Sequence, residues 1–193
     1  DVEGWARRTW WLLVTALVVV SVGALLATTW LVITGLLCYG AGVVALLVPL
    51  RTGGLRRAVR RPAPWFLVCA VVWLLVALVV ETGWLLRSPD SLSLVIDRLL
   101  PLLAVGFAAQ VLVGALTQLL PVALGRGPVE SRRIAAVLQR GWPLRLVATN
   151  AAIPLLAFDL PRPVSVAAWG LEIVSVGSFV LVALSVAAPV AYR

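Results

Sequence analysis

The sequence predicts an all-α integral membrane protein, a bundle of six transmembrane helices with both termini in the cytoplasm. Three observations lead to this prediction. The 193 residues are 62% hydrophobic and only 12% charged, whereas soluble domains are nearer half apolar and a quarter charged. Several apolar runs reach the roughly 20 residues that a spanning helix needs. Arginine supplies all of the basic side chains and gathers in alternate connecting segments.

The spans follow from the apolar runs in chain order. The first run, residues 9–50, carries no charge and is about twice the length of one span, so we divide it at Thr28-Thr29. A single long, tilted helix is the alternative, and it would reverse the orientation of everything downstream. The fifth span is the weakest because it contains an arginine, an asparagine and a proline. The six predicted spans are approximately residues 9–27, 30–50, 64–80, 99–124, 142–158 and 164–190.

Arginine and tryptophan give two tests of the span count. With the N-terminus inside, 13 of the 16 arginines fall on the cytoplasmic side, as the positive-inside rule requires. A five-span arrangement would place the two most basic connections on opposite faces. Tryptophan prefers the membrane interface, and Trp10, Trp30, Trp65 and Trp142 open predicted spans, whereas Trp73 is central. We therefore expect a multi-pass protein of the cell (plasma) membrane.

Two connecting segments are predicted to be helical. Residues 127–141 begin with a proline after Gly127 and end in glycine, which are helix start and stop signals. Ile134, Val137 and Leu138 share one face, which predicts a short amphipathic helix lying on the cytoplasmic surface of the membrane. Residues 88–96 predict a second interfacial helix on the other side.

The connection between the second and third predicted spans is strongly basic. Its arginines either set the topology alone or also bind anionic lipid headgroups, at about 1 kcal/mol per basic residue. The segment has no nucleic-acid recognition module, so we expect lipid and not nucleic acid as its partner. The residues concerned are Arg51, Arg56, Arg57, Arg60 and Arg61.

Polar and small residues line one face of the fourth predicted span. Gly106, Gln110, Gly114 and Thr117 follow helical spacing, and Gln118 is adjacent. Glycines allow a second helix to approach closely, and a glutamine amide can form a hydrogen bond across such a contact. This face is therefore either a helix-packing interface or the polar lining of a cofactor site or conduction path.

Two further polar residues lie deep in apolar runs. Glu172, in the sixth span, is either a proton or cation site or a structural acid that is neutral, paired with an amide or reached by water. Ser175, one turn later, can share a hydrogen bond with it. In the fifth span, Pro154 leaves a backbone carbonyl one turn earlier without its donor, and we expect Asn150 or a neighbour to satisfy it.

The segment lacks the residues of common catalytic sites. The sequence has no histidine, the usual general base and metal ligand. It has no glycine-rich phosphate loop and no pair of carboxylates for acid–base work, and haem and copper lack their normal ligands. The two cysteines, Cys38 and Cys69, sit in apolar runs, where a thiol behaves as a small hydrophobe. We expect no catalytic, cofactor-binding or metal-binding residue here.

The fourth span carries a resemblance to a known group of proteins. Residues 103–125 have the sequence LAVGFAAQVLVGALTQLLPVALG and are followed by Gly127-Pro128. With Val48-Pro49-Leu50-Arg51 and the stretch beginning at Trp73, they resemble the membrane domains attached to bacterial multicopper oxidases and copper nitrite reductase-like proteins. Those domains are distantly similar to haem–copper oxidase subunit I and to NnrS proteins.

The resemblance implies that the chain is the C-terminal half of such a membrane domain and a fragment of a longer polypeptide. Histidine-bearing spans would precede it and a cupredoxin-type copper domain could follow it, so haem or copper would be bound elsewhere in the parent protein. The expected function is non-catalytic: anchoring or supporting a copper-dependent oxidoreductase together with the remaining spans. The alternative is a small permease or proton- or ion-translocating subunit that uses Glu172 and Gln110.

Overall fold

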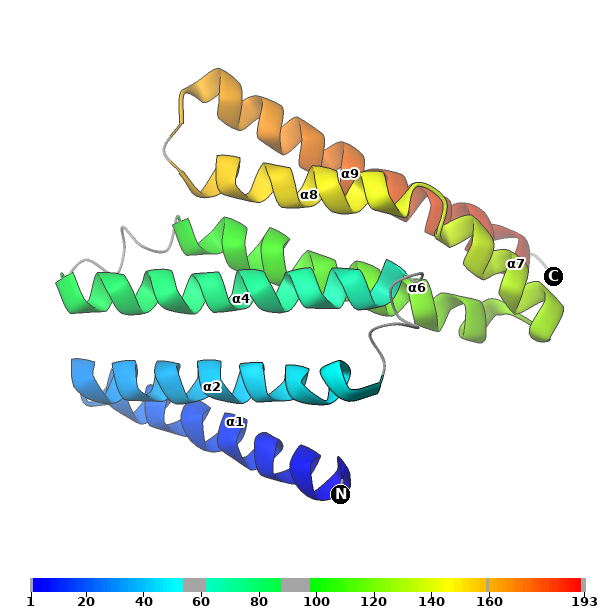
Figure 1. Cartoon of the computed structure of the whole chain (residues 1–193). Coiled ribbons are helices and arrows are strands. Elements are labelled where there is room, and N and C mark those ends of the chain that lie inside the picture. Colours follow the sequence, from blue (N-terminus) through cyan, green and yellow to red (C-terminus); the bar gives the residue numbers. More distant parts are fainter. Residues whose placement is uncertain (1, 54–61, 88–97, 159, 192–193) are drawn as a thin grey trace. The chain divides into compact units, whose positions relative to one another are not determined.

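A computed structural model describes residues 2–53, 62–87, 98–158 and 160–191, and all regular structure within these ranges is helical. The all-α prediction is thus confirmed. Seven helices are present in the described residues, one of which begins as a π-helix, η1, and continues as α6 (Figure 1). They are α1 (Val2–Leu25), α2 (Thr29–Gly53), α4 (Pro62–Arg87), η1 (Pro101–Ala109) with α6 (Gln110–Leu124), α7 (Pro128–Leu138), α8 (Trp142–Ala157) and α9 (Arg162–Ala191).

Five of these helices are long and apolar enough to cross a membrane, which indicates a multi-pass membrane protein. The five stretches are Gly4–Leu25, Thr29–Leu47, Pro62–Arg87, Arg98–Leu124 and Arg162–Ala188. The remaining predicted span forms α8, which has only 16 residues and is therefore roughly 24 Å long. It ends where Phe158 adopts an extended backbone conformation, one turn after Pro154.

The helices extend beyond the predicted spans at several ends. The span predicted to end at residue 80 is too short, because α4 continues through Glu81 to Arg87. Likewise, α1 begins at Val2 and includes Arg7 and Arg8. Hydropathy falls at a charged residue, but the backbone hydrogen bonds of a helix do not stop there, and arginine and glutamate are good helix formers.

The predicted helix in residues 127–141 exists as α7, but its apolar face does not lie on a membrane surface. Ile134 and Leu138 are buried in an apolar cluster with Phe66, Val113 and Phe179, which come from α4, α6 and α9. The apolar face of α7 therefore packs on other helices of the protein. The amphipathic pattern alone could not show whether this face would contact protein or lipid.

Two other predictions fall on residues that the structure does not describe. The interfacial helix proposed for residues 88–96 lies outside the described ranges. The same is true of the side chains of the basic connection, namely Arg51, Arg56, Arg57, Arg60 and Arg61.

The chain divides into two compact units, and α4 contributes to both. Unit 1 comprises residues up to Ala58 together with Leu74–Leu99, and unit 2 comprises Val59–Trp73 together with Leu100–Arg193. Unit 1 therefore contains α1, α2 and the second half of α4. Unit 2 contains the first half of α4 and all of the later helices.

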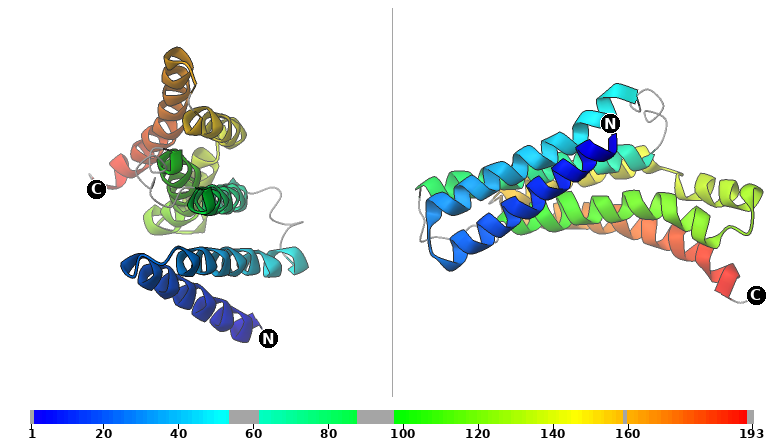
Figure 2. Two further views of the ribbon diagram at one scale, coloured as in Figure 1. Left: turned by 90° about the vertical axis from the view of Figure 1, so that its left-hand side faces the viewer. Right: turned by 90° about the horizontal axis from the view of Figure 1, so that it is seen from below.

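In unit 1, α1 and α2 form a tight antiparallel hairpin (Figures 1 and 2), which excludes the alternative of one long helix. At the end of α1, Ala27 has a positive φ of 50°. The N–H of Thr28 donates to the carbonyl of Gly23, and that of Ala27 to the carbonyl of Ala24. This is the Schellman pattern, which closes a helix and reverses the chain.

Glycines bring α1 and α2 into close contact. A Cβ atom added to Gly35 would lie 2.8 Å from the backbone nitrogen of Val20 and 3.1 Å from the carbonyl oxygen of Ala16. Beside this contact, Ile33 and Leu36 of α2 pack with Leu85 of α4. Without a hydrophobic driving force between helices in lipid, such close backbone contact is a main source of association.

In unit 2, α8 and α9 lie side by side as an antiparallel pair (Figure 1), and η1 with α6 packs against α8. The segment η1 has the wider π-helical turn, a rare arrangement that often occurs at functional sites. Trp142 and Leu146 of α8 pack on the same apolar cluster as Leu120 and Leu124 of α6. Thus the start of α8 and the last turns of α6 contribute to the same cluster.

Substituting Gly35 with alanine should destabilise the protein, because the added methyl group meets backbone atoms that cannot rotate away. We expect a loss of about 1–3 kcal/mol in the free energy of unfolding, measured by detergent-induced unfolding in mixed micelles. The matched control is Gly83→Ala in α4, where an added Cβ meets nothing within 4 Å. Equal stability of the two variants would contradict the proposed packing.

Candidate intramembrane polar site

Asn150 of α8 is the centre of a hydrogen-bonded group that joins three helices of unit 2. Its Oδ1 accepts a hydrogen bond of 2.7 Å from Nε1 of Trp73 in α4 and a longer one of 3.4 Å from Nε2 of Gln110 in α6. Its Nδ2 donates to the carbonyl of Leu146 at 2.7 Å. The thiol of Cys69 also interacts with Asn150. Asn150 thus ties α8 to α4 and α6 and serves a carbonyl one turn before its own position.

The neighbouring residue, Thr149, belongs to a second group that joins α8 to α9. The hydroxyls of Thr149 and Ser175 are 2.9 Å apart, and Ser175 donates to the carbonyl oxygen of Arg145 at 3.0 Å. Because serine has one hydroxyl hydrogen and the carbonyl takes it, Thr149 must be the donor to Ser175. The Thr149 oxygen keeps its lone pairs for a further donor.

Glu172 of α9 lies beside this second group. Its side chain is only 5% exposed, and neither carboxyl oxygen has a hydrogen-bond partner among the described residues. The hydroxyl of Thr149 is the polar group that interacts with it, without meeting hydrogen-bond geometry. An ionised, unpaired carboxylate at membrane depth is costly, so the Thr149 oxygen is placed to accept from a protonated carboxyl group.

Two grooves approach these groups. One, of about 520 Å³, borders Glu172 and is otherwise apolar, with Val105 and Ala109 of η1 facing α9 across it. The other, of about 350 Å³, includes Ser175 and extends to Arg140 and Gly141 at the turn between α7 and α8. The second groove therefore leads from the turn between α7 and α8 to Ser175.

Arg145 has a structural role that the sequence analysis did not anticipate. It was counted among the charges that set the topology, but it is only 9% exposed. One guanidinium nitrogen, Nη2, donates to the carbonyls of Leu138 and Arg140, and the group lies 5.6 Å from the ring centre of Phe179. Arg145 thus holds the end of α7 against α8 and α9, as basic side chains often do at helix C-termini.

The small and polar residues predicted to share one face of the fourth span do lie on one buried face of η1 and α6, except for Gln118. Gln110 is 1% exposed and Thr117 is buried, although the Thr117 hydroxyl donates only to the carbonyl of Val113 in its own helix. A Cβ on Gly106 would lie 2.8 Å from Cβ of Trp73, and one on Gly114 3.2 Å from Cβ of Phe66. This face is in close contact with α4, whereas Gln118 is exposed.

Sequence reasoning missed several members of the two polar groups. Trp73 was identified only as a central tryptophan, and Thr149 and Cys69 were not considered as polar partners. Their only sequence signal is a position in mid-span, which does not reveal which helix each one faces. The predicted pair of Glu172 and Ser175 lies on one helix, but Ser175 bonds to α8.

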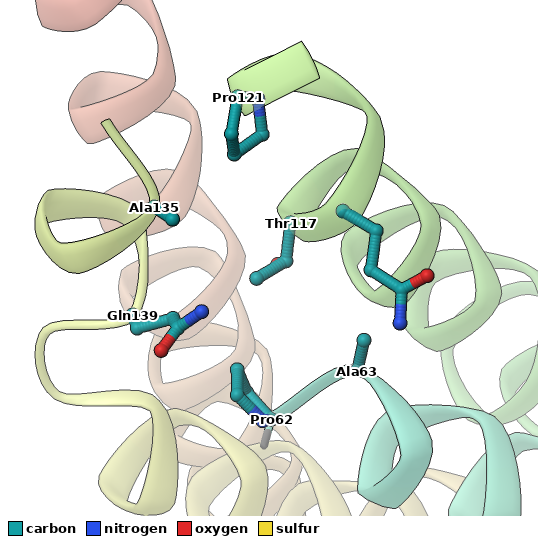
Figure 3. Close-up of a pocket in the computed structure, with 7 residues that line it drawn as sticks. Pro62, Ala63, Thr117, Pro121, Ala135 and Gln139 are labelled. Atoms are coloured by element: carbon teal, nitrogen blue, oxygen red, sulfur yellow. The ribbon is translucent and has the colours of Figure 1, made fainter. Parts of the chain in front are cut away.

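A separate pocket of about 410 Å³ lies in unit 2 where α4 begins and α6 ends (Figure 3). Thr117 and Pro121 of α6 face Ala135 of α7 and Gln139, which directly follows α7, across it, and Pro62 lies at one side. The lining residues are Pro62, Ala63, Thr117, Gln118, Pro121, Ala135 and Gln139.

Within the described residues, no group of three or more histidine, cysteine, aspartate or glutamate side chains could hold a metal ion, and both cysteines are free. In comparisons with known proteins, no family model matches the chain, and neither a curated protein nor a solved structure matches it. Function must therefore be argued from the polar groups themselves.

A double-mutant cycle on Trp73→Phe and Asn150→Leu should reveal a favourable coupling. The phenylalanine keeps most of the ring but removes the indole N–H, and leucine removes its acceptor. We expect a coupling free energy of roughly 0.6–1.7 kcal/mol, the range for hydrogen bonds between membrane helices, measured by detergent-induced unfolding. Pairing Trp73→Phe with Thr34→Ala, whose hydroxyl bonds only within its own helix, should be additive. Additivity in both cycles would show that the indole–amide bond contributes nothing.

Proposed function

We propose that the chain is a helical membrane domain that binds and conducts protons, with Glu172 as the group that is protonated and released. The observation that carries this proposal is the position of Glu172: a buried carboxyl group with no hydrogen-bond partner in the described part of the chain, beside the linked hydroxyl groups of Thr149 and Ser175 (the hydroxyl row). Ionisable residues inside a membrane are expensive and commonly mark ion or proton pathways.

The direction of the hydrogen bonds suggests how the site works. Thr149 donates to Ser175, which donates to the carbonyl of Arg145, so a protonated Glu172 would turn its hydrogen towards the free lone pairs of the Thr149 oxygen. When the proton leaves, the carboxylate can only accept, so Thr149 must turn its hydrogen towards Glu172 and give up its bond to Ser175. The two protonation states thus require opposite orientations of one hydroxyl group.

The groove at Ser175 supports access from one end of the unit. It extends from Arg140 and Gly141 to Ser175, so a proton arriving with water at the α7–α8 turn meets the hydroxyl groups before Glu172. On its other side, Glu172 faces the apolar groove along η1. In this proposal the hydroxyl row serves one side of the membrane, and Gln110 belongs to the Asn150 group and only positions α6.

Replacing Glu172 with glutamine should abolish proton flux, since glutamine has nearly the same shape but does not titrate. Purified protein in liposomes with an internal pH dye and an imposed potassium diffusion potential should lose flux at least about tenfold in this variant. Ser175→Ala should slow it, because the hydroxyl row is broken. Glu81→Gln is the matched control, an acid of α4 outside the two polar groups. Normal flux in Glu172→Gln, or a wild-type flux no greater than that of empty liposomes, would refute the proposal.

A second candidate function rests on the resemblance of residues 103–125. In it, the chain is the non-catalytic C-terminal half of a membrane domain that anchors a copper-dependent oxidoreductase in the plasma membrane, with haem or copper bound elsewhere in the parent protein. The close contact of Gly106 and Gly114 with α4 suits an anchoring bundle. Its arginine-rich connection would bind anionic lipid headgroups. In that case Glu172→Gln would leave both assembly and the parent enzyme's activity intact.

We also propose that α8 crosses the membrane as the sixth span, with both termini in the cytoplasm. Trp142 packs on the same apolar cluster as Leu124 of α6, and Asn150 bonds Gln110 near the middle of the continuous η1–α6 helix. The seven residues from Ala151 to Ala157 add about 10 Å in the same direction. Although short, α8 thus follows most of the length of the η1–α6 helix, and it returns the chain to the side where α9 begins.

Cysteine labelling tests this topology. In a variant without the native cysteines, Val129→Cys in α7 should react with a membrane-impermeant maleimide only from the cytoplasmic side. Leu160→Cys, between α8 and α9, should react only from the opposite side. Both positions are exposed, and neither substitution alters a charge. Labelling of both cysteines from one face would show that α8 does not cross.

A further inference from the structure

The pocket between α4, α6 and α7 has the size and depth of a ligand site in a membrane. Its volume of about 410 Å³ falls within the range of about 300–1,000 Å³ for small-molecule sites. It lies at the last two turns of the span Arg98–Leu124 and the first turn of the span Pro62–Arg87. Span ends lie near the headgroup region, where the polar ring of a membrane-soluble amphiphile resides.

The lining combines hydrogen-bonding groups with apolar surfaces. No hydrogen bond engages the side-chain amides of Gln118 and Gln139 in the described part of the chain, and a carboxamide both donates and accepts. Pro121 has no N–H, so the carbonyl of Thr117 lacks its usual helical donor and is a further acceptor. Pro62 and Pro121 supply flat apolar surfaces (Figure 3).

The charge of the lining limits the ligand. None of the seven described lining residues is charged, so these residues offer no countercharge to a cation or to a phosphate group. The two amides and the open carbonyl instead suit a neutral ring that has oxygen atoms at its edge. A side-chain amide can donate a hydrogen bond to a ring carbonyl and accept one from a ring hydroxyl. The pocket can therefore hold both the oxidised form of such a ring, which has carbonyls, and the reduced form, which has hydroxyls.

We propose that this pocket binds the head ring of an uncharged membrane quinone or quinol. The apolar tail would leave towards lipid past the exposed side chains of Leu119 and Val122 on α6. This site is separate from Glu172 and shares no residue with either polar group, so it stands or falls independently of proton conduction.

A pair of adjacent substitutions in α7 tests the proposal. Ala135 lines the pocket and Ala136 is exposed on another face of the same helix, so Ala135→Trp fills the site and Ala136→Trp is its matched control. Saturable binding of a labelled short-chain ubiquinone and a short-chain menaquinone is measured on the whole chain in nanodiscs, with empty nanodiscs as background. We expect at least about tenfold weaker binding in Ala135→Trp and unchanged binding in Ala136→Trp.

The glutamines supply the second readout. Gln118→Leu and Gln139→Leu should each weaken binding about three- to tenfold, as the loss of one neutral hydrogen bond does. Photolabelling with an azidoquinone should mark peptides containing Ala63, Thr117 or Gln139. The proposal is overturned if neither quinone binds saturably, if Ala135→Trp and Ala136→Trp bind alike, or if excess phosphatidylglycerol displaces the label from a headgroup site.

Discussion

Every polar group inside a bilayer must find its partner within the protein, because no water is available there. In unit 2 this constraint is met largely by one short helix, α8. Asn150 supplies an acceptor for Trp73 and Gln110, Thr149 donates to Ser175, and both do so from adjacent positions on α8. Since successive helical residues point about 100° apart, the two groups face different neighbours. One helix can therefore fix the positions of α4, α6 and α9 together.

This arrangement explains why α8, the least hydrophobic predicted span, also makes the most polar contacts with neighbouring helices. A helix with an arginine, an asparagine and a threonine inserts poorly by itself. Here the Nη2 of Arg145 donates to two carbonyls at the end of α7, and Asn150 and Thr149 are bonded to neighbouring helices. Polar residues that oppose insertion of an isolated α8 become the residues that hold the assembled unit. Glu172 departs from this rule, since among the described residues neither of its carboxyl oxygens has a hydrogen-bond partner, whereas Gln110 and Arg145 each leave only one buried side-chain atom unpaired.

How much the sequence reveals depends on the range of the interaction. Apolar length predicted the all-α fold and the break between α1 and α2, because both are decided within about 20 residues. The helical spacing of Gly106, Gln110 and Gly114 correctly grouped them on one face. The partners across that face could not be derived, since nothing local in Trp73 or Asn150 says that residues 77 positions apart in sequence meet. Likewise, the amphipathic pattern of α7 defined its apolar face but not that this face packs on protein.

The remaining puzzle is why unit 2 leaves Glu172 unsatisfied when α8 satisfies so many other groups. Thr149 is near enough to serve it, yet its hydrogen is committed to Ser175 because Ser175 is itself committed to the carbonyl of Arg145. A purely structural acid would be better served by glutamine, which carries its own donors and needs no proton. Beside Thr149 and Ser175, a carboxyl group differs usefully from an amide only if it changes its protonation state. The hydroxyl groups then have two alternative orientations, one for each state. Glu172 is thus an acid at a site where an amide would cost less free energy in a purely structural role. This favours a protonation role for Glu172.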